Sequence, residues 1–254
     1  MLLALDCGNT HMVIGLFEGE QLKYSWRLSS EDKKTEDEYM VLLRTLMEAH
    51  SLDIAAIDGM IVASVVPSVN FNLRKLAEKH LHIEPIFVNY RTKSGLKIDM
   101  ENPAEVGADR IVNAIAAHHI YGGTLIVVDF GTATTFDCVL EDARYIGGAI
   151  CPGIEISQRA LFTYASQLSS IAMVKPPSVI GRNTAQALRS GMQWGYGGQV
   201  DALVRRMSLE LPSQPQVIAT GGLAQTIAGF SDSIDHVDVD LTLKGLQMIY
   251  AINN

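Results

Sequence analysis

Two short segments of the sequence carry residue types that could bind a nucleotide phosphate and its cation. Residues 3–10 and 126–135 each contain an apolar strand, an aspartate, a glycine two positions later and then small hydroxyl or amide side chains. A glycine lets the backbone turn tightly and approach a ligand. Backbone N–H groups and hydroxyls can hold phosphate oxygens, while Asp6 and Asp129 can hold a cation or its water shell. Two such turns facing one cleft predict a clamp for nucleotide phosphates.

The polar residues of these turns have predicted roles of their own. One acid after an apolar strand can simply cap a turn, but two at equivalent points favour phosphate and metal binding. Thr10 and Thr132 are candidate phosphate-contacting hydroxyls, and Asn9 can donate from its amide. Cys7 lies within the first turn and is predicted to be a small buried filler, not a nucleophile.

A third glycine turn, Thr220-Gly221-Gly222, follows a short apolar strand. Alone it is an ordinary turn. Beside two phosphate turns, a glycine pair would let a flat adenine ring lie against bare backbone. We favour nucleotide contact.

The segment Gly107-Ala108-Asp109-Arg110 could carry the acid–base chemistry. Asn102-Pro103 predicts the start of a helix that runs to about residue 119. On such a helix Asp109 shares a face with Glu105, and like charges at that spacing raise a carboxylate's proton affinity, which suits a general base. A solvated acidic face explains the pair equally well. Arg110 could bind a substrate carboxylate or pair with an acid.

Two further segments leave their roles open. Gly181-Arg182-Asn183-Thr184 opens a predicted helix, where Asn183 or Thr184 is either a plain cap or a ligand contact. Residues 147–153 are dense in glycine. This indicates either a simple break between a strand and a helix, or a place where a substrate or the second lobe approaches the backbone closely. The seven histidines form no HExxH pattern, which favours surface or structural roles.

The elements that must position these residues repeat along the chain. A shift of about 123 residues superposes Asp6 on Asp129, and each turn is followed by two more extended stretches. This predicts two antiparallel meanders from a duplicated unit. Further predicted elements are helices over 35–50, 68–80, 154–167, 183–208 and 241–252, and strands over 61–66, 85–88, 217–219 and 234–239.

These elements predict an α/β protein with two lobes, residues 1–115 and 116–254. The chain has 254 residues with 48% hydrophobic and 19% charged residues, enough for a substantial core. A formal charge of −8 argues against nucleic acid or an anionic membrane as main partner. Three unpaired cysteines, no membrane-length apolar run and no signal peptide predict a cytoplasmic protein.

Taken in order, the motifs resemble those of the bacterial type III pantothenate kinases, in the acetate and sugar kinase/Hsp70/actin superfamily. The resemblance covers nearly the whole chain and implies two duplicated ribonuclease H-like lobes with mixed sheets, an actin-like ATPase fold. The motifs are Asp6-Cys7-Gly8-Asn9-Thr10, Glu105-Val106-Gly107-Ala108-Asp109-Arg110, Asp129-Phe130-Gly131-Thr132-Ala133-Thr134-Thr135, Gly181-Arg182-Asn183-Thr184 and Thr220-Gly221-Gly222.

The resemblance also implies an activity. Such enzymes transfer the γ-phosphoryl group of ATP to pantothenate, the first step of coenzyme A biosynthesis. They use a divalent ion such as Mg²⁺ and a monovalent cation, K⁺ or NH₄⁺, and are usually homodimers. Asp109 matches the proton acceptor and Asp129 the monovalent-cation ligand. The ATP contacts implied are Asp6, Cys7, Gly8, Asn9, Thr10, His11, Met12, Val13 and Thr132, and the pantothenate contacts implied are Gly107, Ala108, Asp109, Arg110 and Thr184.

One position departs from the family pattern. Met100 stands where the family often has a tyrosine, and a methionine keeps apolar bulk at this substrate edge without a hydroxyl donor. Two other functions are also considered: a regulatory relative that binds a nucleotide without turnover, and a kinase for another small hydroxy acid.

Overall fold

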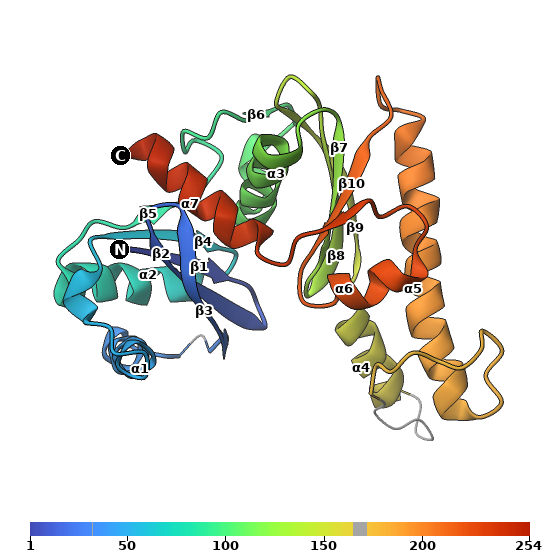
Figure 1. Ribbon diagram of the computed structural model, residues 1–254, viewed down its shortest axis with the longest axis horizontal. Helices are drawn as coiled ribbons and strands as arrows, with labels where there is room; N and C mark the ends of the chain where they lie inside the picture. Colours follow the sequence, from blue (N-terminus) through green and yellow to red (C-terminus); the bar gives the residue numbers. More distant parts are fainter. Residues whose placement is uncertain (32, 165–171) are drawn as a thin grey trace. The chain divides into compact units, whose positions relative to one another are not determined.

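The first three strands form the antiparallel meander that the repeat predicts. In the computed structural model, which describes residues 1–31, 33–164 and 172–254, β1 (Leu2–Cys7) pairs with β2 (His11–Glu18), and β2 pairs with β3 (Gln21–Ser29) (Figure 1). The strands β4 (Gly59–Ser64) and β5 (Ile86–Phe87) continue the sheet in parallel on the other side of β1. The resulting order is β3-β2-β1-β4-β5.

The second half of the chain repeats this topology. Its strands stand in the order β11-β10-β7-β8-β9, in which β7 and β10 are parallel and β7, β8 and β9 form the antiparallel meander. β7 begins at residue 125, 123 residues after β1 begins at residue 2, so the predicted duplication is confirmed. The strands are β7 (Leu125–Phe130), β8 (Ala133–Val139), β9 (Arg144–Pro152), β10 (Gln216–Thr220) and β11 (His236–Val237).

Helices occur close to the predicted places. Thr35 caps the first helix with the predicted capping box, because its hydroxyl accepts from the Glu38 backbone while the Glu38 carboxylate accepts from the Thr35 backbone. The α-helices are α1 (Glu36–Glu48), α2 (Pro67–Leu76), α3 (Ala108–Tyr121), α4 (Ile154–Tyr164), α5 (Thr184–Ser208), α6 (Ala224–Ile227) and α7 (Leu241–Asn253). Short helical turns of other types cover Ile54–Ala56, Ala77–Leu81, Pro103–Glu105 and Ala228–Phe230.

The segment 90–101, predicted as loop, contains the two-residue strand β6 (Lys97–Ile98). The predicted helix 154–167 is described as far as Tyr164, and its last three positions lie outside the described residues. No helix in the described ranges is long and apolar enough to cross a membrane.

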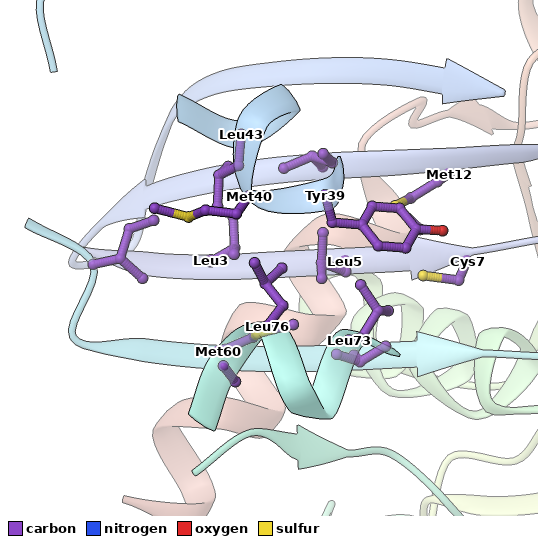
Figure 2. Packing of buried hydrophobic residues seen from close by; sticks show 14 of the residues in the cluster. Leu3, Leu5, Cys7, Met12, Tyr39, Met40, Leu43, Met60, Leu73 and Leu76 are labelled. Atoms are coloured by element: carbon purple, nitrogen blue, oxygen red, sulfur yellow. The ribbon is translucent and has the colours of Figure 1, made fainter. Parts of the chain in front are cut away.

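The core of the first sheet fills one face and is covered by α1 and α2. Because side chains alternate along a strand, Leu3, Leu5 and Cys7 share this face and Asp6 lies on the opposite one. Figure 2 shows Leu3 and Leu5 among the side chains of α1 and α2. This packing fixes the direction of β1 and therefore the face on which the Asp6 carboxylate is presented.

The chain divides into two units, residues 1–116 with 241–254 and residues 117–240. The first boundary falls within a residue or two of the predicted one, but α7 lies with the first unit and not with the predicted lobe 116–254. Its packing explains the difference. Leu243 contacts the backbone of β2 at Gly15, Gly245 lies directly against the Val112 carbonyl of α3, and the Thr242 hydroxyl donates to Asn113 Oδ1 over 2.7 Å.

Candidate functional site

The first candidate turn connects β1 to β2. Asp6 is the penultimate residue of β1 and lies between Val13 of β2 and Ala63 of β4. The Gly8 N–H donates to the His11 carbonyl over 3.0 Å and closes the turn. Asn9 and His11 are exposed and Asp6 is partly buried. The turn therefore presents a carboxylate and an exposed amide at the end of a buried strand.

Two residues of this turn point their side chains into the core. Cys7 and Met12 are only 1% and 2% exposed, and Figure 2 places both among the buried residues. Burial, with a smaller contribution from the Asp6 charge, raises the pKa of the Cys7 thiol well above its usual range. A protonated, buried thiol is a poor nucleophile, so Cys7 is the filler that was predicted. Any contact of Cys7 or Met12 with a ligand would use the backbone.

The second turn connects β7 to β8 at the corresponding place and closes one residue earlier than the first. Asp129 is the penultimate residue of β7, opposite Thr135 of β8. The Gly131 N–H donates to the Ala133 carbonyl over 3.0 Å, and the Gly153 N–H donates to the Thr132 carbonyl over 3.2 Å. Thr132 is partly buried. The duplicated sheet therefore presents a second carboxylate and a second hydroxyl at the corresponding strand end.

The Thr220-Gly221-Gly222 turn lies against this second carboxylate. β10 runs parallel to β7 with Thr220 beside Asp129. Gly221 has a φ of +92°, and a Cβ atom at this position would lie 2.5 Å from Asp129 Oδ1 and 2.8 Å from the Phe130 backbone. The glycine is therefore required both by its backbone conformation and by the space that the Asp129 side chain occupies. The sequence placed this turn near a nucleotide but gave no sign of its contact with Asp129.

The segment around Asp109, residues 102–119, is not the continuous helix that was predicted. Pro103–Glu105 form a single 3₁₀ turn, and α3 begins only at Ala108. Glu105 and Asp109 therefore do not share a helix face, and the argument from like-charge spacing does not apply. The Asn102 amide donates to Glu105 Oε1 over 2.7 Å instead of capping the turn. The break occurs at Val106 and Gly107, where the backbone leaves one helical turn and enters the next.

Asp109 occupies the first turn of α3, where the helix dipole stabilises a carboxylate. Its Oδ1 accepts a hydrogen bond from the Arg110 backbone N–H over 2.8 Å. Val65, which follows β4, connects this segment to the first turn. Its N–H donates to the Cys7 carbonyl over 3.1 Å, and its side chain would lie 3.5 Å from a Cβ atom at Gly107. The first unit thus brings the turn after β1 and the segment around Asp109 to either side of one residue that the sequence did not single out.

With Asp109 as the proton acceptor that the resemblance implies, Gly107→Ala is expected to lower kcat about 10²-fold, because a displacement of the order of 1 Å at a reacting group has that effect. A Cβ atom at Gly107 would lie 2.5 Å from Asp109 Oδ1, so the carboxylate must move. Steady-state phosphorylation kinetics measure the change. Gly229→Ala is the matched control, since no atom lies within 4 Å of its added methyl group. A Gly107→Ala enzyme as fast as this control would contradict the expectation.

The other predicted substrate contacts differ in exposure, and Thr184 is exposed. Thr184 is the first residue of α5, and the cap of this helix is Asn183, whose Oδ1 accepts from the Gln186 N–H over 2.9 Å. The Thr184 hydroxyl is therefore not the helix cap. Met100 is partly buried two residues after β6, and Ala108 is buried, so Ala108 could meet a ligand only through its backbone. Met100 belongs to the first unit and Thr184 to the second.

The acids at the strand ends suit hard cations. Within the described residues, no group of three or more His, Cys, Asp or Glu side chains could hold a metal ion. Mg²⁺ in kinases is typically bound by one or two carboxylates together with substrate phosphates and water, and needs no such group. Asp6 and Asp129, each a partly buried carboxylate beside a glycine turn, fit that mode.

The duplicated sheets, each with an aspartate and a glycine turn after its first strand, define the class: an α/β protein of the actin-like ATPase fold. Solved structures agree. A protein from Campylobacter jejuni assigned to the Baf family of transcriptional activators has a TM-score of 0.62 and 20% identity over 99% of this chain and 98% of its own. A protein from Sinorhizobium meliloti assigned as a 2-dehydro-3-deoxygalactonokinase has a TM-score of 0.60 and 14% identity, over 99% of this chain and 96% of its own. Component A of (R)-2-hydroxyglutaryl-CoA dehydratase from Acidaminococcus fermentans has a TM-score of 0.57 and 11% identity, over 98% of this chain and 96% of its own.

The sequence gives the narrower assignment. Residues 2–206 match the model of the family described as type III pantothenate kinase. The chain belongs to this family and is therefore a phosphotransferase.

Proposed function

We propose that this chain transfers the γ-phosphoryl group of ATP to the primary hydroxyl of pantothenate, which yields 4′-phosphopantothenate for coenzyme A synthesis. The observation that carries the proposal is the position of Asp109 in the first unit. This carboxylate lies over Gly107 in the first turn of α3, and Val65 connects its segment to the backbone of the phosphate turn. A proton acceptor beside a phosphate-binding turn is what transfer to a hydroxyl requires.

The donor side of the proposal uses both glycine turns. Asn9 and Thr10 of the first turn and Thr132 of the second supply amide and hydroxyl groups for phosphate oxygens. Gly221 and Gly222 supply bare backbone for the nucleotide. Asp6 would hold hydrated Mg²⁺ and Asp129 a monovalent cation, K⁺ or NH₄⁺, which when bound offset the negative charge of the phosphates.

The acceptor side uses the segment around α3. Asp109 accepts the proton of the attacking hydroxyl, and Arg110 binds the carboxylate of pantothenate. Gly107 and the backbone of Ala108 line the same segment, and Met100 supplies an apolar edge. Thr184 contributes a hydroxyl from the start of α5.

A coupled assay of ADP release tests this function. With ATP, Mg²⁺ and K⁺ present, pantothenate is expected to stimulate ADP release far above the rate without an acceptor. A panel of other small hydroxy acids in the same assay tests the acceptor, because the rate should be highest with pantothenate. A higher rate with another acid would assign the enzyme to that substrate.

The likeness to a protein assigned as a transcriptional activator favours one alternative, a regulatory protein that binds nucleotide without turnover. If this chain is such a regulatory protein, it would bind ATP in a direct binding measurement and release no ADP with any acceptor. The carboxylates at positions 6, 109 and 129 favour the kinase, since a protein that only binds nucleotide has no need of a proton acceptor.

We also propose a homodimer formed through the surface around α4 and the start of α5. Several apolar side chains of α4, of residues 174–180 and of α5 are exposed, and Tyr164 and Ile180 are 89% and 80% exposed. Such a surface is typical of a protein–protein interface. The surface consists of Ile156, Leu161, Tyr164, Val174, Val179, Ile180 and Trp194.

Light scattering after size-exclusion chromatography is expected to give twice the chain mass of 27.7 kDa. Ile180→Glu places a charge within the surface and is expected to shift the protein to the monomer. Leu209→Glu changes a leucine that is 83% exposed just beyond the far end of α5, and is expected to leave the dimer intact. A wild-type monomer would overturn the proposal.

A further inference from the structure

Ser30, the residue that follows β3, holds the first turn by two hydrogen bonds. Its hydroxyl donates to the Gly8 carbonyl oxygen over 2.5 Å. Its backbone N–H donates to the Thr10 carbonyl oxygen over 3.0 Å. One residue, distant in sequence from the turn, therefore contacts carbonyl groups on both sides of Asn9.

These two hydrogen bonds also determine where the N–H groups of the turn point. In a trans peptide, the carbonyl of one residue and the N–H of the next point in opposite directions. No peptide bond among the described residues is cis. Because the Gly8 carbonyl points to Ser30, the Asn9 N–H points away from it. The Thr10 carbonyl directs the His11 N–H away from Ser30 in the same manner. Two N–H groups of the turn, those of Asn9 and His11, are therefore directed away from Ser30 and are available to an anion.

The duplicated unit also holds its turn through the residue that follows its third strand, but the carbonyl that accepts the backbone N–H lies one position earlier in the repeat. Gly153 follows β9 as Ser30 follows β3, 123 residues later. Its N–H donates to the Thr132 carbonyl over 3.2 Å. A Cβ atom at Gly153 would overlap the Thr132 carbonyl and lie 2.6 Å from the Gly131 oxygen. The second turn is therefore held by backbone packed against backbone. In the first turn, the Ser30 hydroxyl reaches the carbonyl that corresponds to Gly131.

We propose that Ser30 is a positioning residue for the nucleotide-binding turn. It acts by fixing the two peptide groups on either side of Asn9 and Thr10, so that the Asn9 and His11 N–H groups are directed to the phosphates of the bound nucleotide before binding. Without the hydroxyl, the Gly8–Asn9 peptide can rotate and the turn must be ordered during binding, which weakens affinity. This inference rests on the proposed function, because it assumes that the first turn binds nucleotide.

The test compares two side chains of the same shape. Ser30→Thr keeps a hydroxyl, whereas Ser30→Val replaces it with a methyl group. Loss of one such hydrogen bond corresponds to an affinity about tenfold weaker. We therefore expect Ser30→Val to raise the Kd for ADP and the KM for ATP about tenfold. Ser30→Thr is expected to stay close to the wild type, and the KM for pantothenate is expected to stay unchanged in both variants.

Controls separate positioning from general stability. Ser25→Ala removes an exposed hydroxyl from the same strand and is expected to leave the Kd for ADP unchanged. If circular dichroism shows that Ser30→Val does not fold, Ser30→Ala, which fills less space than serine, takes its place. A hydroxyl-free variant with the Kd for ADP of wild type would overturn the inference. So would equal losses in the KM values for ATP and pantothenate, which indicate a purely structural role.

The binding measurement also distinguishes this inference from the proposed function. If the wild-type protein binds ADP but phosphorylates no pantothenate, the proposed reaction is wrong while the Ser30 comparison still decides the inference. If the wild-type protein does not bind ADP, both are overturned.

Discussion

Asp109→Asn is expected to lower kcat for pantothenate phosphorylation about 10²–10⁴-fold, the usual contribution of general base catalysis. The two side chains have nearly the same shape, and an asparagine oxygen can still accept the hydrogen bond that the Arg110 N–H donates to Asp109 Oδ1 over 2.8 Å. The start of α3 should therefore remain folded. An amide, however, does not accept the proton of the attacking hydroxyl. The Kd for ATP should stay within about twofold, because Asp109 belongs to the proposed acceptor side of the site.

Glu105→Gln is the matched control for this variant. Glu105 is a neighbouring exposed acid in the preceding 3₁₀ turn, where its contact is the Asn102 amide. Its replacement is expected to leave kcat and both KM values near those of wild type. An unchanged kcat in Asp109→Asn would falsify the assignment of Asp109 as the base, and a large loss in Glu105→Gln would move that role to Glu105.

Gly221→Ala is expected to have two effects. It should lower the free energy of unfolding by about 1–3 kcal/mol, and it should impair catalysis. An alanine must adopt the φ of +92° that Gly221 has, and its methyl group must displace Asp129 Oδ1, which would be 2.5 Å away. Urea unfolding measures the first effect. The second appears as a higher K⁺ concentration for half-maximal activity, because Asp129 is the proposed ligand of the monovalent cation.

Gly122→Ala separates these two effects. Gly122 also has a positive φ, +66°, but no atom lies within 4 Å of its added methyl group. It should therefore lose stability through backbone strain alone and keep the K⁺ dependence of wild type. If Gly221→Ala shows the same K⁺ dependence as Gly122→Ala, then Asp129 does not bind the cation in the manner proposed.

Local sequence patterns predicted much of the fold because the interactions concerned are local or repeated. The capping box of Thr35 and Glu38 lies within four residues, and it forms as expected. The meanders were predictable because a tight turn joins each pair of neighbouring strands, and the shift between Asp6 and Asp129 showed that the unit occurs twice.

The contacts that sequence patterns missed join residues far apart along the chain. These contacts depend on how the strands pair in the sheet. They are the contacts of Val65 with Cys7 and Gly107, of Gly221 with Asp129, and of Ser30 with the first turn. The break at Val106 and Gly107 was missed for a different reason. Asn102-Pro103 has the residue types of a helix start, so the sequence pattern did not indicate that α3 begins only at Ala108. The repeat itself offered a signal for Ser30, since the same shift superposes it on Gly153.

The packing of α7 has a consequence for how the protein is made. Residues 241–254 complete the first unit but leave the ribosome only after all of residues 117–240. Until then Gly15 of β2 and Val112 of α3 lack the helix that covers them. The earlier-synthesised part of the first unit therefore keeps apolar surface uncovered until α7 has been made, and exposed apolar surface on a newly made chain is prone to aggregation.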